Sequence, residues 1–288
     1  MSDTLVEQKL NKGTGGIFDP IDERDKSQDI DLPDRDSLEK AVDLRKWCSP
    51  IEDQGQINSC TAHAAIALME YYQKKCFGKH LDASRLFLYK VTRNLLGYQE
   101  DRGANARTTM KALRLFGVPP EEHWKYDPTK LYEEPPAFCY ALASYYQALE
   151  YFRLDVKGTT RDVLLHKIKV YLADQHPLMF SSRFHLDCLE QAETTGKIPV
   201  PSDFKTPWYG HTMAAVGYDD SIKIKNTDPG GIETTGAIVI RNSWGADWGD
   251  NGYGWLPYEY VLKPLTNDWW TMQKQEWLDT KEFDSKFS

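Results

Sequence analysis

The sequence lacks several features that would place it in whole classes of protein. No stretch approaches the roughly 20 consecutive apolar residues of a membrane-spanning helix, so a helical membrane protein is not expected. Basic residues are not in excess, because 35 Lys and Arg stand against 43 Asp and Glu, for a net charge of -8 at pH 7. Nucleic acids and anionic membrane surfaces select basic faces. We therefore predict neither nucleic acid nor membrane as a partner.

Cysteine is scarce, and its spacing gives no pairing pattern. The chain has five cysteines, an odd number, which are scattered and include no C-x-x-C pair: Cys48, Cys60, Cys76, Cys139 and Cys188. Such a set fits reduced thiols better than a disulfide framework. The N-terminus has neither the basic nor the apolar region of a secretory signal. These absences predict a cytoplasmic protein, and signal-independent export stays open as an alternative.

Motifs for metals and cofactors are also missing. His185 with Cys188, and Cys60 with His63, superficially resemble halves of a zinc site, but no second pair has zinc spacing. The Gly13–Gly16 run lacks the Lys-Ser/Thr of a phosphate loop. We therefore predict no metal and no cofactor. His63 is interpreted as a hydrogen-bonded histidine of the core.

Cys60 stands where a reactive thiol is favoured. It opens a run of apolar and small residues that extends to Met69 and is typical of a helix buried inside a domain. Asn58 and Ser59 are good N-cap residues, which predicts Cys60 in the first helical turn. The helix dipole favours an anion there, so we expect a lowered pKa for this thiol. The other four cysteines are interpreted as buried apolar residues.

Two polar residues far downstream can complete a thiol active site. His211 comes just before a predicted strand at 213–218. Asn242 follows a second predicted strand at 237–240, and a turn signal at 226–231 separates the two. Antiparallel pairing of these strands would bring the histidine and the asparagine together. One cysteine with a distant histidine and asparagine is the pattern of a thiol hydrolase.

General chemistry gives each group a role. The Cys60 thiolate would attack a carbonyl carbon to form a thioester, and His211 would protonate the leaving amine and then activate water. Asn242 would fix the orientation of the imidazole ring. The Cys60 N–H and the Gln54 amide would donate hydrogen bonds to the developing oxyanion. Trp244 would cover the bond between the histidine and the asparagine.

Three motifs carry a resemblance to a known family. Residues 54–60 read Gln-Gly-x-x-x-Ser-Cys, and residues 210–218 read Gly-His-x-x-x-x-Val-Gly-Tyr. Residues 242–253 read Asn-Ser-Trp-Gly-x-x-Trp-Gly-x-x-Gly-Tyr. In this order and spacing, the motifs resemble those of the papain family of cysteine peptidases over roughly residues 41–265. The sequence departs from the family's usual pattern at Ile57, where a cysteine is common, and at Thr61, where a tryptophan is usual.

The resemblance implies a fold, a substrate class and a set of site residues. The expected fold is α+β and two-lobed, with a helix-rich half over about 41–146, an antiparallel β-rich half over about 147–288, and the active site between them. The expected partner is a peptide or protein substrate. The family's nucleophile, acid/base, orienting and oxyanion roles fall on Cys60, His211, Asn242 and Gln54. Substrate contacts are predicted at Gly103, Ala104, Thr212 and Trp244, and the Met179–Ser181 strand is a further candidate for lining an apolar pocket.

Residues 1–40 differ from the rest of the chain. The flexible Gly13–Gly16 run precedes a segment crowded with acidic residues from Asp19 to Asp36, and little in it could build a core. One interpretation is a mobile, solvated arm. The other, which rests on the resemblance, is a short pro-segment that contacts the cleft and makes the protein a zymogen.

The sequence therefore predicts a cysteine-type peptidase that works through a thioester and is gated by its N-terminal arm. Two alternatives remain open. One is an acyl transferase or transpeptidase with the same triad, which partition of the thioester to an added amine would distinguish. The other is a non-catalytic peptide-binding module on a peptidase scaffold.

Overall fold

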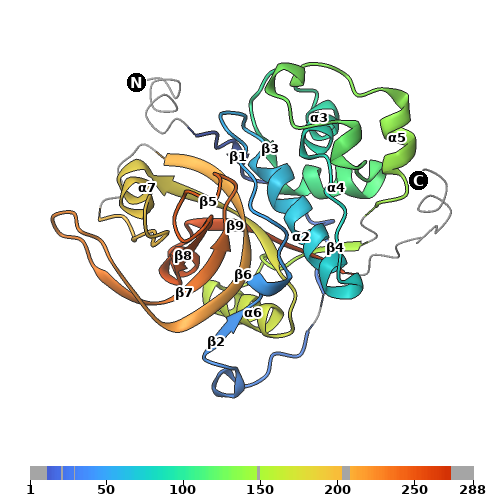
Figure 1. The fold of residues 1–288 in the computed structure, drawn as a ribbon. Helices are drawn as coiled ribbons and strands as arrows, with labels where there is room; N and C mark the ends of the chain where they lie inside the picture. Colours follow the sequence, from blue (N-terminus) through green and yellow to red (C-terminus); the bar gives the residue numbers. More distant parts are fainter. Residues whose placement is uncertain (1–11, 21, 29, 148–149, 203–207, 274–288) are drawn as a thin grey trace.

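The computed structural model describes residues 12–20, 22–28, 30–147, 150–202 and 208–273. Figure 1 shows two halves side by side, one built from helices and the other from a large sheet. Within the described residues, no helix combines the length and the apolar character needed to cross a bilayer.

The helix-rich half is organised around one buried helix. Its elements are α2 (Cys60–Phe77), α3 (Arg85–Leu96), α4 (Ala106–Phe116), α5 (Ala137–Ala143) and the short 3₁₀ turns η3 (Glu121–His123) and η4 (Pro128–Lys130). Every residue of α2 from Cys60 to Tyr71 is buried, as the apolar pattern predicted. This helix contacts α3 and α4 on one side and the sheet on the other. It therefore lies at the junction of the two halves (Figure 1).

The second half is an antiparallel sheet of seven strands with helices around it. Its strands are β2 (Ala41–Asp43), β4 (Glu150–Arg153), β5 (Leu178–His185), β6 (Trp208–Lys225), β7 (Glu233–Arg241), β8 (Tyr253–Pro257) and β9 (Thr266–Gln273). They are ordered β4-β9-β5-β6-β7-β8, and β2 joins β6. The accompanying helices are η1 (Arg35–Ser37), η2 (Arg45–Trp47), α6 (Arg161–Ala173), α7 (Leu186–Ala192) and α8 (Glu259–Leu262).

The hairpin of β6 and β7 confirms the two predicted strands and their pairing. Ala214 pairs with Arg241, and Ala215 pairs with Ile240. His211 lies three residues before Ala214 on β6, and Asn242 directly follows the end of β7. Both residues therefore lie at the same end of the hairpin. Both observed strands are longer than predicted.

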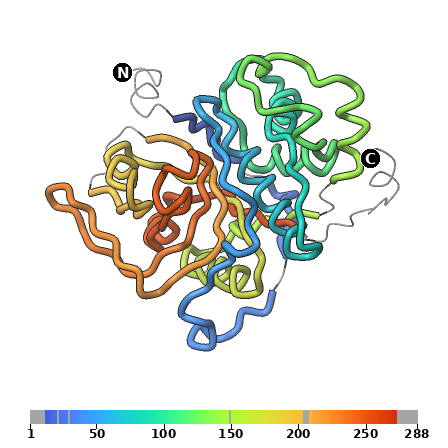
Figure 2. Tube along the Cα trace, viewed as in Figure 1, coloured from blue at the N-terminus to red at the C-terminus, as the bar shows by residue number. Residues whose placement is uncertain are grey.

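A small parallel sheet joins the start of the chain to the helix-rich half. Strand β1 (Gly16–Ile17) pairs with β3 (Ala104–Asn105), with Gly16 opposite Ala104 and Ile17 opposite Asn105. Strand β1 also contacts β5 and β6. The blue start of the chain in Figure 2 accordingly runs between the two halves.

Candidate active site

Cys60, the predicted nucleophile, is the first residue of α2. Ser59 is the N-cap residue, which agrees with the expected helix start. The thiol is completely buried and accepts hydrogen bonds from the backbone and side chain of Thr212. Burial raises its pKa to about 12, and those hydrogen bonds only partly oppose the shift. The expected lowering of the thiol pKa is therefore wrong for this conformation, because lost solvation outweighs the helix start.

His211 and Asn242 lie in direct contact. The His211 Nε2 is 2.8 Å from the Asn242 Oδ1. Since an amide oxygen only accepts hydrogen bonds, Nε2 carries the proton and Nδ1 is the open nitrogen of the neutral ring. Within the described part of the chain, Nδ1 is buried and has no hydrogen-bond partner. Burial lowers the pKa of His211 to about 4, against a smaller raising effect of the bond to Asn242.

Trp244 lies over the imidazole. Its ring stacks on that of His211, with centroids 4.6 Å apart and planes at 23°. The ring of Trp248 in turn packs edge-on against Trp244, with centroids 5.6 Å apart. Two large apolar rings thus limit the approach of water to the histidine from this direction.

Gln54 is held between the two halves by three contacts. Its backbone N–H donates to the Ser243 carbonyl at 2.9 Å, and its Oε1 accepts a hydrogen bond from the Ser243 hydroxyl. Its Nε2 donates to the Ile57 carbonyl at 2.8 Å. The segment just before Cys60 is thereby tied to the segment just after Asn242. The Gln54 amide is consequently oriented before any ligand binds.

The start of the chain passes through this site in contact with the predicted catalytic and substrate-binding residues. The Gly13 N–H donates to the Gly55 carbonyl at 2.7 Å, and the Gly13 carbonyl accepts from the Trp244 Nε1–H at 2.9 Å. The Gly15 carbonyl accepts from the Ala104 N–H at 3.0 Å. From Gly13 to Gly15 the arm is thus bound as a ribbon of main-chain atoms, whereas the Lys12 side chain donates to the Trp244 carbonyl at 3.0 Å.

Close approach requires glycine at two positions of this ribbon. A Cβ on Gly13 would lie 2.2 Å from the Ile57 carbonyl oxygen. A Cβ on Gly15 would lie 2.4 Å from the Asn58 Cβ, and Gly15 has a φ of +85°. Side chains do not fit at either distance, and a positive φ disfavours them further at Gly15. In the sequence, the glycine run itself was the signal for this close approach of the arm.

The predicted substrate contacts lie along the same ribbon. A Cβ on Gly103 would be 2.0 Å from the Gly15 carbonyl oxygen, and Ala104 donates to that oxygen. Thr212 Oγ1 is 3.0 Å from Ser181 Oγ, so the predicted pocket wall on β5 and β6 is joined by a hydrogen bond. The structure therefore places these residues and Trp244 in contact with the same segment of the arm.

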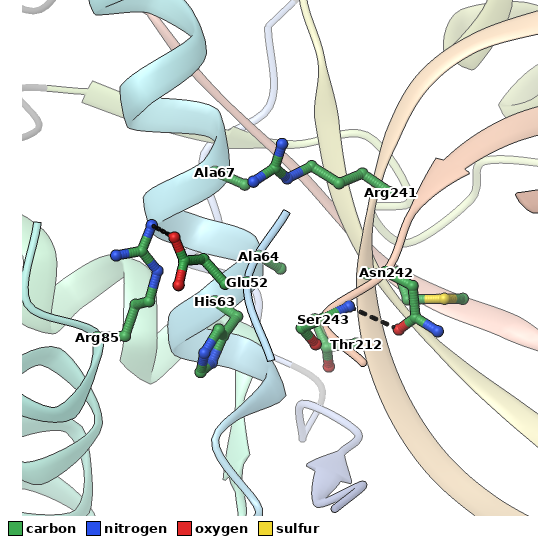
Figure 3. Close-up of a pocket in the computed structure, with 10 residues that line it drawn as sticks. Glu52, His63, Ala64, Ala67, Arg85, Thr212, Arg241, Asn242 and Ser243 are labelled. Atoms are coloured by element: carbon green, nitrogen blue, oxygen red, sulfur yellow. Dashed lines mark hydrogen bonds and ion pairs between the residues drawn. The ribbon is translucent and has the colours of Figure 1, made fainter. Parts of the chain in front are cut away.

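His63 is a core histidine, as interpreted from the sequence. Its Nδ1 is 3.1 Å from the Ser59 carbonyl oxygen, and its ring meets Tyr126 edge-on. Burial lowers its pKa to about 3. Figure 3 shows His63 with the paired Glu52 and Arg85 on one side of a small pocket, and Thr212, Asn242 and Ser243 on the other.

A buried chain of charges was missed in the sequence. The Arg85 guanidinium donates to both carboxylate oxygens of Glu70, at 3.0 and 3.2 Å. The Ser49 hydroxyl also donates to Glu70, and Arg241, next to Asn242, donates to the Ser49 carbonyl. The available signal was a glutamate within an otherwise apolar helix, because a buried carboxylate requires partners.

Comparisons with known proteins agree with this fold. The model of the papain family cysteine proteases matches residues 38–261. An uncharacterized peptidase C1-like protein, L477, of Acanthamoeba polyphaga mimivirus is 34% identical over 242 residues, which are 82% of this chain and 73% of that protein.

Solved structures give the same result. Xylellain, a cysteine protease from Xylella fastidiosa, has a TM-score of 0.74 and 30% identity, covering 92% of this chain and 97% of its own. Digestive procathepsin L 3 of Tenebrio molitor larval midgut has a TM-score of 0.68 at 17% identity, covering 95% of this chain and 80% of its own, and shares the fold. The two-lobed α+β fold and its buried thiol thus define a cysteine peptidase. The chain belongs to the papain family.

Proposed function

We propose that the protein hydrolyses peptide bonds through a Cys60–His211–Asn242 triad and a thioester, and that arm residues 12–19 block its cleft until they are displaced. The observation that carries the chemistry is the 2.8 Å bond from His211 Nε2 to Asn242. It leaves Nδ1 as the ring nitrogen that can exchange a proton with the thiol and with the leaving amine.

The reaction runs in two halves with the same residues. Cys60 Sγ bonds to the substrate carbonyl carbon while its proton passes to His211 Nδ1, which then gives that proton to the departing amine. Water next attacks the thioester, loses a proton to Nδ1, and releases the acid and the regenerated thiol. The Gln54 Nε2–H, already oriented by Ser243, donates to the oxyanion after exchanging its bond to Ile57.

The block of the cleft is supported by burial as well as by contact. With the arm in place, the Cys60 thiol has a pKa of about 12 and His211 a pKa of about 4. Near neutral pH both groups are therefore uncharged, whereas nucleophilic attack needs the thiolate. Displacing the arm would restore solvent to both groups and bring their pKa values toward each other.

The proposed chemistry is tested by Cys60→Ala. This variant should lose turnover of fluorogenic peptides and labelling by an epoxysuccinyl thiol-protease inhibitor, while its circular dichroism stays that of the unchanged protein. Turnover by the Cys60→Ala protein would overturn the mechanism.

Addition of an amine nucleophile to the active protein separates hydrolysis from acyl transfer, because an acyl transferase would yield mainly the amide.

The proposed block is tested in the full chain by Gly13→Val together with Gly15→Val, hereafter the opened variant. The added side chains collide with Ile57 and Asn58 and should expel the arm. Inhibitor labelling of Cys60 should then rise at least about tenfold, as expected if closure is favoured by about 1.4 kcal/mol or more. Asp31→Val, at an exposed arm position, is the matched control and should leave labelling unchanged. Equal labelling of all three proteins would show that the arm is no barrier.

A further inference from the structure

A carboxylate-binding arrangement lies along the arm beyond the predicted catalytic residues. The side chain of Asp19 is fully buried. Its Oδ1 accepts the backbone N–H of Arg107 at 3.0 Å, and its Oδ2 accepts the Trp270 Nε1–H at 2.9 Å and the Arg153 Nη1 at 3.3 Å. We call Arg107, Arg153 and Trp270 the carboxylate cradle. All of its donors belong to the body of the protein, and its occupant belongs to the arm.

Elementary electrostatics explains why the cradle selects an anion. Arg107 lies in the first turn of α4, an 11-residue helix whose N-cap is Asn105. Backbone N–H groups in a first turn have no partner within the helix and lie at the positive end of its dipole. A guanidinium and an indole N–H complete the set of donors. Charge-assisted bonds of this kind are stronger than neutral ones and are best made by a carboxylate. Burial on balance raises the pKa of Asp19, and the donors of the cradle oppose that shift.

The cradle lies at one end of the predicted substrate groove. Arg107 follows β3 by two residues, and β3 pairs with β1 so that Ile17 faces Asn105. Trp270 pairs with Met179 across β9 and β5, and the Met179–Ser181 strand is the predicted wall of the pocket for the side chain two residues before the cut. The cradle is thus beyond that pocket, on the upstream side of the scissile bond.

The spacing along the arm indicates how many residues separate the cradle from the backbone of His211. A Cβ on Gly16 would be 2.9 Å from backbone atoms of His211. Asp19 follows three residues later and enters the cradle. An extended peptide advances by about 3.3 Å for each residue. A substrate side chain three or four residues from the scissile bond therefore reaches the same position.

Departure of the arm changes the charge balance of this region. From the arm, Asp25 contacts both Arg107 and Arg153, and Asp19 contacts Arg153. From the body of the protein, Asp155 and Asp268 also contact Arg153. Lys157 lies nearby and pairs with Glu23 of the arm. Without the arm, Arg153 keeps Asp155 and Asp268. Arg107 loses Asp25, its only carboxylate contact closer than 4 Å among the described residues.

We propose that the carboxylate cradle is a substrate subsite, and that after displacement of the arm it binds an acidic side chain three or four residues upstream of the scissile bond. This proposal rests on the proposed function and adds a substrate class to it, namely peptides with Asp or Glu at that distance. In the covered protein, Asp19 occupies the subsite in the substrate's place.

The test compares peptides that differ at one residue. Matched fluorogenic peptides carrying Asp, Asn or Lys at the third or the fourth position upstream of the cut are turned over by the opened variant. The Asp peptide should have about tenfold higher kcat/KM than the Asn peptide at one of these positions, as one charge-assisted bond predicts. Arg153→Met in the opened variant removes the guanidinium that contacts Asp19 Oδ2 and should bring that ratio near one. Trp270→Phe, which removes only the indole N–H donor, should lower the ratio as well. Arg114→Met, at an exposed position of α4, should preserve it.

Binding without turnover keeps this proposal separate from the proposed function. Calorimetry of the same peptides on the opened variant carrying Cys60→Ala should give about tenfold tighter binding of the Asp peptide. Equal affinities, or no measurable binding of either peptide, would overturn the subsite and leave the cradle as an anchor for the arm alone. Selective binding with no turnover by the opened variant would support the subsite and count against the proposed peptidase chemistry.

Discussion

Cys60 is subject to two opposing effects, and their magnitudes decide which one wins. A helix start stabilises an anion by about 0.3–1 kcal/mol, which is less than one pKa unit. Burial of the thiol raises its pKa from 9.0 to about 12. Covering the residue therefore cancels the advantage of its position in α2. The reactivity of this cysteine therefore depends on whether its thiol is buried or exposed to solvent.

This balance predicts a pH dependence for alkylation of Cys60. If the arm contributes to the burial of the thiol, as the proposed function requires, the buried thiol holds its proton more tightly than the exposed one. Closure of the arm is then favoured below about pH 9 and weakens as the pH rises toward 12. The rate of iodoacetamide modification, followed by mass spectrometry of Cys60, should rise only at high pH in the unchanged protein. In the opened variant the rise should shift to lower pH. Superimposable profiles would contradict this account.

A second prediction for a single residue concerns Asn242. In the opened variant, Asn242→Ala should lower kcat about 100-fold with little change in KM, because the imidazole loses the bond that fixes its tautomer and orientation. Steady-state kinetics on one peptide measures the effect. Asn94→Ala, at an exposed position of α3, serves as the control and should leave kcat unchanged. An unaltered kcat for Asn242→Ala would remove this residue from the proposed triad.

At the scale of elements, the buried Glu70–Arg85 pair joins α2 to α3. Both side chains are almost completely buried, with exposures of 0% and 4%. A buried pair adds little net stability, but removing one partner leaves an uncompensated charge. The pair thus constrains how the two helices pack more than it strengthens the fold.

Removal of Arg85 should therefore be costly. Arg85→Met is expected to lower the free energy of unfolding by about 3–5 kcal/mol, because the Glu70 carboxylate stays buried without its guanidinium. Urea denaturation measures the loss, with Arg114→Met on α4 as the exposed control. Adding Glu70→Met to Arg85→Met should recover part of the stability. A loss no larger than that of the control would show that Glu70 finds another partner.

The hairpin of β6 and β7 shows how far sequence reasoning reaches. Its turn signal and alternating strands predicted that His211 and Asn242 would meet, and the family's motifs predicted the arrangement of halves on either side of Cys60. The path of the arm could not be predicted. Asp19 and Arg153 are 134 residues apart, and a contact between such distant residues leaves no periodic pattern in either segment. The thiol pKa was misjudged because the burial of Cys60 depends on how the two halves of the chain pack, which local sequence does not reveal.

At the scale of the whole molecule, the carboxylates around Arg153 link the arm to the sheet. Arg153 contacts four of them, Asp19, Asp25, Asp155 and Asp268. One guanidinium cannot balance four negative charges. Burial, together with the charge of Asp19, accordingly raises the pKa of Asp268 to about 8 in spite of its 2.7 Å bond to Arg153.

This crowding predicts a pH-dependent effect of Asp268→Asn. The folded protein holds the Asp268 proton more tightly than the unfolded chain, so the stabilising contribution of that proton is lost as the pH rises from about 4 to about 8. Asparagine has no such loss, and it tolerates the φ of +58° at this position. The Tm of the variant relative to the unchanged protein should therefore increase between pH 5 and pH 9. A difference in Tm that is constant with pH would contradict the shift.

The ribbon of glycines in the groove has a consequence for how this protein can diversify. Its hydrogen bonds at Gly13 and Gly15 use main-chain atoms of the arm, and their partners are Gly55, Trp244 and Ala104, not Met179 or Ser181. On the proposed function, substitutions at Met179 or Ser181 would therefore alter the peptide preference without weakening inhibition by the arm. The two properties would depend on different residues, so related proteins could change one and keep the other.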